Sequence, residues 1–108
     1  MNAPVEITKL RPGIPGKVMN LAGGEYVIAP LNLRQLEELS DIIDSVANLT
    51  TLREVSQAAL ALAFASLSRN YPDITEAQVR EIVDVGNMRE VIETTLDVSG
   101  YGKTTPGE

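Results

Sequence analysis

The sequence predicts an α+β fold in one small domain, with an N-terminal β-hairpin followed by four helices that pack around a central apolar helix. Three observations favour this fold. The 108 residues, 44% of them apolar, suffice for one hydrophobic core but not for two. Residues 1–30 are punctuated by proline and glycine, as is typical of short strands and turns, and residues 31–100 carry apolar side chains at helical spacing. Residues 101–108 have almost no apolar side chains, so we expect them to form a flexible tail.

The β-hairpin is predicted from two short runs on either side of a glycine-rich turn. Residues 17–21 and 25–28 are the expected strands, and Ala22-Gly23-Gly24 joins them. The glycines can adopt the positive φ that a tight reversal requires. Residues 5–8 also alternate apolar and polar side chains, which makes them a candidate third strand.

The four helices are predicted from a repeated start signal, in which a polar N-cap residue is followed three positions later by Glu or Gln. The pairs are Asn32 and Gln35, Thr51 and Glu54, Thr75 and Gln78, and Asn87 and Glu90. Such pairs form capping boxes, because each side chain accepts a hydrogen bond from the other residue's backbone.

The ends of the helices are also predicted from local signals. Tyr71-Pro72 ends the second helix, which covers about residues 51–69, because proline disfavours helical backbone in the residue before it. Gly86 and Gly100 are expected to adopt the left-handed conformation that ends the third and fourth helices. The second helix is apolar on nearly every side, so we expect it at the centre of the fold.

The first helix is expected to bury one apolar face and to expose an acidic one. The apolar face consists of Leu33, Leu36, Leu39, Ile42, Ile43 and Val46, and the acidic side chains are Glu37, Glu38, Asp41 and Asp44. These carboxylates lie outside any calcium-binding loop pattern, so we interpret them as a solvated surface and predict no metal site.

The composition favours a protein that is not an enzyme. The chain has neither cysteine nor histidine, which removes disulfides, thiol nucleophiles, Cys/His zinc sites and the Ser-His-Asp triad. No catalytic residue and no cofactor is predicted.

The net charge of −6 argues against direct binding of nucleic acid or of an anionic membrane, because both repel an acidic protein. The N-terminal residues show no signal peptide, and the longest apolar run, residues 58–65, is too short to span a bilayer. We therefore expect a cytoplasmic protein.

Because catalysis and binding to nucleic acid or membranes are not expected, we predict that the chain binds partner proteins through apolar side chains. The candidate partner-binding residues, all on the second and fourth predicted helices, are Phe64, Leu67, Met88, Val91 and Ile92. Met88 is unbranched and adaptable, which suits a groove for an amphipathic helix. The alternative is that these side chains simply pack inside the domain.

Four blocks of sequence resemble the tail assembly chaperones of long-tailed bacteriophages and prophages. The blocks are residues 31–37, 69–75, 83–87 and 98–100, and the most distinctive is Asn-Tyr-Pro-Asp-Ile-Thr at residues 70–75. The resemblance covers about residues 25–100. It implies a mainly helical protein of the host bacterial cytoplasm that binds the tape-measure protein and delivers tail-tube subunits without covalent chemistry.

One further expectation follows from this resemblance. Members of the family often have a longer form made by ribosomal frameshifting, and Gly102-Lys103 is compatible with a slippery codon pair. A competing hypothesis is a structural virion component, either a head–tail connector or a tail subunit, that self-assembles into rings. The sequence leaves open whether the chain forms a homo-oligomer.

Overall fold

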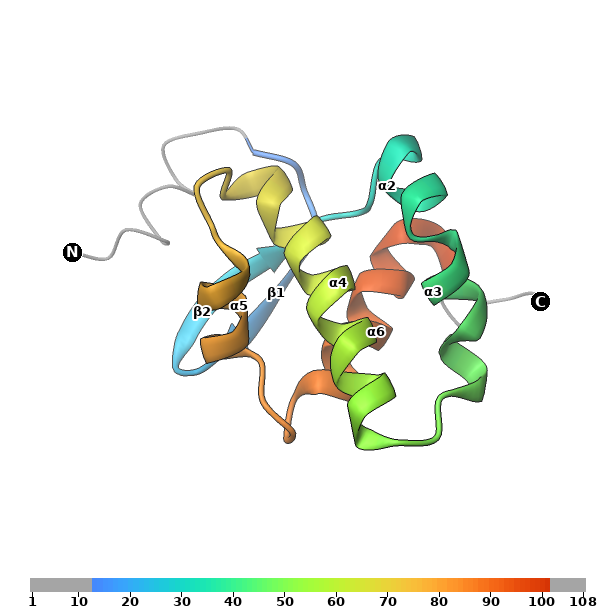
Figure 1. Ribbon diagram of the computed structural model, residues 1–108. Coiled ribbons are helices and arrows are strands. Elements are labelled where there is room, and N and C mark those ends of the chain that lie inside the picture. The colour runs from blue at the N-terminus through green and yellow to red at the C-terminus, as the bar shows by residue number, and fades with distance from the viewer. Residues whose placement is uncertain (1–12, 102–108) are drawn as a thin grey trace.

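The structure is a computed structural model that describes residues 13–101 (Figure 1). The candidate third strand at residues 5–8 lies outside the described residues. Of the expected tail, the structure describes Tyr101 alone, at the end of the last helical turn.

The predicted β-hairpin is confirmed. Strands β1 (Lys17–Leu21) and β2 (Gly24–Ile28) are antiparallel, and Leu21 pairs with Gly24 next to the turn. The turn residues Ala22 and Gly23 have φ values of 52° and 84°. Two consecutive residues with positive φ are typical of the two-residue turn that best matches the twist of a hairpin.

Helical segments follow the hairpin, which confirms the α+β prediction. They are α2 (Leu33–Glu38), α3 (Ser40–Ser45), η1 (Val46–Asn48), α4 (Leu52–Asn70), α5 (Glu76–Ile82), α6 (Met88–Leu96) and η2 (Asp97–Tyr101). Helix α4 is the predicted central helix, since α5, α6 and β2 all contact it (Figure 1).

Three of the four predicted capping boxes form, at the starts of α2, α4 and α5. The fourth prediction is wrong, because the Asn87 side chain makes no capping bond at the start of α6. Asn87 has φ −115° and ψ −4°, whereas a capping residue normally has extended backbone. Its side chain points back instead, so that Asn87 Oδ1 accepts from Asp84 N while Asp84 Oδ1 accepts from Asn87 N, both at 2.9 Å.

The predicted helix ends are partly confirmed. Helix α4 stops before Tyr71-Pro72, and Gly100 has the expected left-handed backbone with φ 95°. The prediction for Gly86 is wrong, because α5 has already ended at Ile82 and Gly86 does not have a positive φ. Val83 is extended (φ −100°, ψ 125°), and the paired side chains of Asp84 and Asn87 then shape the turn into α6.

The first predicted helix is broken at Leu39, which has φ −103° and ψ 11° and separates α2 from α3. Leu33 is 76% exposed, so its expected place on the buried face is also wrong. Leu33 is exposed because Gln35 takes the side of the helix that faces α4. Gln35 is buried and donates from Nε2 to the Ala65 carbonyl of α4 at 2.9 Å. Gln35 lies about 200° from Leu33 around the helix, so Leu33 must face solvent when Gln35 faces α4.

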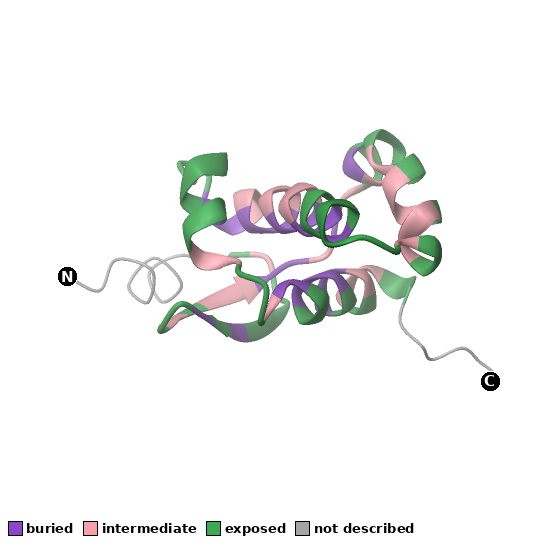
Figure 2. Ribbon diagram, turned by 60° about the horizontal axis from the view of Figure 1, so that its bottom comes forward, coloured by how far each residue is buried: buried purple, intermediate pink, exposed green. Residues whose placement is uncertain are grey.

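Helix α4 contributes to both hydrophobic clusters of the core. Figure 2 colours the buried residues of the chain purple. The cluster beneath the hairpin contains Met19, Leu21, Ile28, Ala63, Leu67, Tyr71, Val79 and Val91. The other cluster contains Leu31, Val55, Ala58, Ala59, Leu62, Met88 and Ile92. Leu62 and Leu67 are fully buried, whereas Leu60 and Phe64 are half-buried because α4 is left uncovered along one side.

Polar side chains of α4 hold the connector segment, which we define as residues 27–31. Ser66 Oγ donates to the Ala29 carbonyl at 2.8 Å, and Arg69 Nη1 donates to the Pro30 carbonyl at 2.8 Å. Tyr71, immediately after α4, accepts from Val27 N at 3.0 Å. The connector segment therefore passes from the hairpin to α2 with the Ala29 and Pro30 carbonyls bonded to α4 and Val27 N bonded to Tyr71.

Three further hydrogen bonds extend this attachment to the chain on either side. Asn70 binds the backbone of Ile14 twice, accepting from its N–H and donating to its carbonyl, the latter at 2.8 Å. Leu31 N donates to Ser99 Oγ at 2.9 Å, which ties the connector segment to η2. These contacts join parts of the chain that are far apart in sequence.

Replacing Ser66 by alanine should lower the free energy of unfolding by about 1–3 kcal/mol, because it removes the hydrogen bond to the carbonyl of Ala29, a residue with 0% exposure. Urea unfolding measures the change. Ser68→Ala is the matched control, since the Ser68 hydroxyl donates within α4 to the Ala65 carbonyl, which also accepts from Gln35. Equal destabilisation by the two variants would contradict this account of the connector segment.

Candidate partner-binding groove

Four of the five predicted partner-binding residues lie in the core. Leu67 and Val91 are 0% exposed, Met88 is 3% exposed and Ile92 is 4% exposed, while Phe64 is half-buried. The apolar face of α6 packs against α4 and is therefore buried within the domain. The core alternative describes Leu67, Val91 and Ile92, whereas the buried Met88 also lines an open groove.

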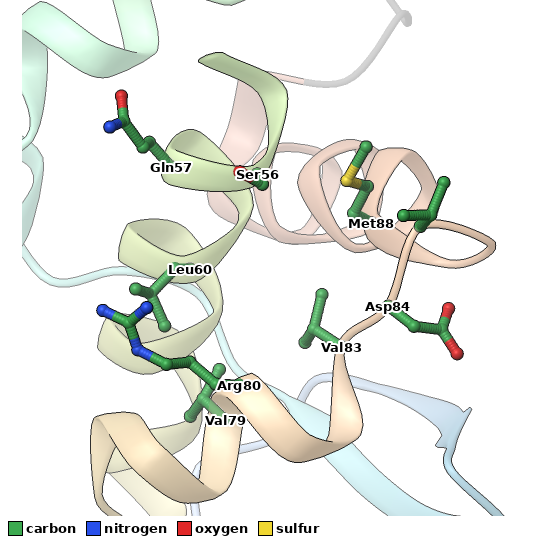
Figure 3. A pocket seen from close by; sticks show the side chains of 9 residues that line it. Ser56, Gln57, Leu60, Val79, Arg80, Val83, Asp84 and Met88 are labelled. Atoms are coloured by element: carbon green, nitrogen blue, oxygen red, sulfur yellow. The ribbon is translucent and has the colours of Figure 1, made fainter. Parts of the chain in front are cut away.

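An apolar surface remains open in a groove between α4, α5 and the α5–α6 loop, which we call the α4–α5 groove (Figure 3). Its volume is about 360 Å³. The residues that line it are Ser56, Gln57, Leu60, Val79, Arg80, Val83, Asp84, Val85 and Met88. This volume is within the range of pockets that bind small ligands or anchoring side chains, about 300–1,000 Å³.

The apolar lining comes from three elements. Leu60 lies on α4. Val83 comes directly after α5 and has extended backbone, and Met88 is the buried first residue of α6. Val85 is at the edge of the groove and is 70% exposed. A partner side chain that entered the groove would therefore cover apolar surface that is now in contact with water.

The edge of the groove is fixed by hydrogen bonds within the α5–α6 loop. In addition to the paired bonds between Asp84 and Asn87, Asn87 Nδ2 donates to the Ile82 carbonyl at 3.1 Å. Met88 N donates to the Asp84 carbonyl at 2.9 Å. The groove is thus formed before any partner binds, which reduces the entropy lost on association.

The polar rim of the groove carries charges of both signs. Arg80 reaches toward Leu60 in Figure 3, while the Asp84 carboxylate points to the other side. Both residues are exposed, and among the described residues the ion pair is Arg34 with Glu38, at 3.1 Å. Arg80 is therefore available to a carboxylate of a partner.

Other charged groups are dispersed over the surface. Within residues 13–101, His, Cys, Asp and Glu side chains do not gather in threes as a cation site would require. No helix in the described part of the chain combines the length and the apolar character needed to cross a bilayer.

The carboxyl group of Glu54 lies at the start of α4 and accepts hydrogen bonds from the backbone. Hydrogen bonds from the backbone N–H groups of Thr50 and Thr51, at 2.9 and 3.2 Å, lower the pKa of the Glu54 carboxyl. The carboxylate belongs to the capping box and does not line the α4–α5 groove.

The sequence did not indicate Val79, Val83 and Val85 as site residues. No local signal set Val83 and Val85 apart, because the third predicted helix was expected to extend to Gly86 and so to include both residues. Leu60 also lines the groove and is half-buried on α4.

Comparison of the chain with family models, with curated proteins and with solved structures finds no match.

Glu54→Gln should weaken the pH dependence of stability. Because the pKa of Glu54 is lowered in the folded state, its charged form stabilises the fold above the unfolded-state pKa, and this contribution is lost as the pH falls through the folded-state pKa. Glutamine retains an acceptor but does not titrate. Urea unfolding over a series of pH values, with Glu37→Gln as the charge-matched control, measures the effect, and identical pH profiles for the two variants would contradict it.

Proposed function

We propose that this chain is a non-enzymatic assembly chaperone of phage tail morphogenesis, which acts in the host bacterial cytoplasm. In this proposal it holds an apolar helical segment of the tape-measure protein and so assists the addition of tail-tube subunits. The observation that carries the proposal is the preformed α4–α5 groove, an open apolar surface with a rim of mixed charge.

The groove suits one amphipathic helix as its occupant. Helices bind apolar grooves through side chains spaced three or four residues apart, and Met88 provides an adaptable base for them. Val85 and the half-buried Leu60 and Val83 offer apolar surface to be covered. Fully burying a side chain of this kind is worth about 1.5–3 kcal/mol, so three partly exposed ones give weak and reversible binding. Weak binding is what a chaperone needs in order to release its client.

Co-expression with the tape-measure protein of the same gene cluster tests the proposal. The full chain should co-purify with that protein and raise its soluble fraction. Val85→Asp should reduce co-purification about tenfold, because it places a charge where a partner helix must exclude water.

Val18→Asp is the matched control for that experiment. Val18 is also an exposed valine, at 56%, but it lies on β1 and does not line the groove. It should leave co-purification unchanged. Equal retention of the tape-measure protein by both variants, or failure of the unmodified chain to co-purify, would contradict the proposal.

The second candidate function, a virion component that forms rings, is favoured by the open edge of β1. In a hairpin with a two-residue turn the pair next to the turn is hydrogen-bonded, so the backbone groups of Val18 and Asn20 point away from β2. Within the described residues the sheet has two strands, so these groups are left available for pairing with another chain.

Light scattering of the purified chain separates the two functions. Monomers or small oligomers are expected for the chaperone. Stable hexamers or larger rings would contradict the chaperone function and favour the virion component, whose subunits must close around the tail axis.

A further inference from the structure

A second pocket lies on the other side of α5 from the α4–α5 groove. Strand β2, the α4–α5 loop and α5 enclose a volume of about 350 Å³, which we call the β2–α5 pocket. The residues that line it are Tyr26, Tyr71, Asp73, Ile74, Gln78, Glu81 and Ile82. This pocket shares no lining residue with the α4–α5 groove.

Two tyrosine rings form the aromatic wall of the pocket. Tyr26 and Tyr71 are packed edge to face, with ring centroids 5.8 Å apart and an interplanar angle of 76°. The Tyr71 hydroxyl is held by its bond to Val27 N. The Tyr26 ring lies against Gly24, where an added Cβ would be 3.3 Å from the ring, so the glycine leaves room for it. Tyr71 is therefore fixed by its hydrogen bond, and Tyr26 is fixed by its contacts with Tyr71 and Gly24.

The charged groups that line the pocket are both carboxylates, those of Asp73 and Glu81, and both residues are exposed. In the part of the chain that the structure describes, neither forms an ion pair. Arg80, the neighbour of Glu81 in sequence, lines the α4–α5 groove instead. The pocket thus combines uncompensated negative charge with aromatic and aliphatic surface.

We propose that the β2–α5 pocket binds an arginine side chain of a partner protein. The aliphatic part of arginine packs against surface such as that of Ile74 and Ile82, while its planar guanidinium stacks on a tyrosine ring and donates to carboxylates. Lysine offers a compact, strongly hydrated charge and satisfies fewer of these groups at once. The net charge of −6 draws a basic segment toward this surface. This inference does not depend on the proposed chaperone function.

Titration of the full chain with a blocked alanine-arginine-alanine tripeptide tests the proposal by NMR. The neutral control is the same peptide with citrulline, which has the shape of arginine without its charge. We expect saturable shifts of the Tyr26 ring and of the Ile74 and Ile82 methyl groups. The arginine peptide should bind about tenfold more tightly than the citrulline peptide, with a lysine peptide between them. Equal binding of arginine and citrulline, or no saturable binding, would overturn the proposal.

Substitution of one carboxylate distinguishes the pocket from general attraction to an acidic protein. Glu81→Gln should weaken binding of the arginine peptide about threefold to tenfold and leave the citrulline peptide unaffected. Glu90→Gln removes an exposed carboxylate of α6 that does not line the pocket, and it should change nothing. Equal weakening by both variants would overturn the proposal.

The chain's own N-terminal segment is a competing source of arginine. Arg11 lies outside the described residues, two positions before Gly13. Arg11→Gln should leave the affinity for the arginine peptide unchanged. A rise of several-fold would mean that Arg11 competes for the pocket and would overturn the assignment to a partner.

Discussion

The hydrogen bonds between the C-terminal part of α4 and the connector segment are the constraint on which the rest of the fold depends. A two-stranded hairpin is only marginally stable alone, so β1 and β2 must be attached to the helices. Ser66, Arg69 and Tyr71 supply that attachment through the backbone of residues 27–30, and Asn70 does the same at Ile14. The bond between Ser66 and Ala29 is buried, so losing it leaves a polar group without water to replace its partner.

The same attachment places two different surfaces on either side of α5. This helix has seven residues and packs against α4, where Val79 is fully buried. On one side the half-buried Leu60 of α4 lines the α4–α5 groove, whose rim carries charges of both signs. On the other side Tyr71, held by the connector segment, forms the wall of the acidic β2–α5 pocket. A partner that carries both an apolar and a basic side chain would match the chemistry of both surfaces.

Local signals in the sequence predicted local structure well. The capping boxes that begin α2, α4 and α5 each join residues three positions apart, and the Ala22-Gly23 turn depends on its own backbone. The break at Leu39 was not predictable in this way, because it accompanies a bond between Gln35 and Ala65, thirty positions apart. For the same reason, local signals could not decide whether the candidate partner-binding residues of α6 are exposed. Periodicity identified the apolar face of α6, but only the fold decides that α4 covers it.

Hydrogen exchange at Val27 tests the central claim most directly. The amide N–H groups of Val27 and Val18 both face outward from the hairpin, but Val27 N donates to the Tyr71 hydroxyl. We predict that Val27 exchanges as slowly as the amides of α4, through global unfolding, while Val18 exchanges fast. If Val27 exchanged as fast as Val18, the hairpin would detach from α4 without unfolding it, which would contradict the account.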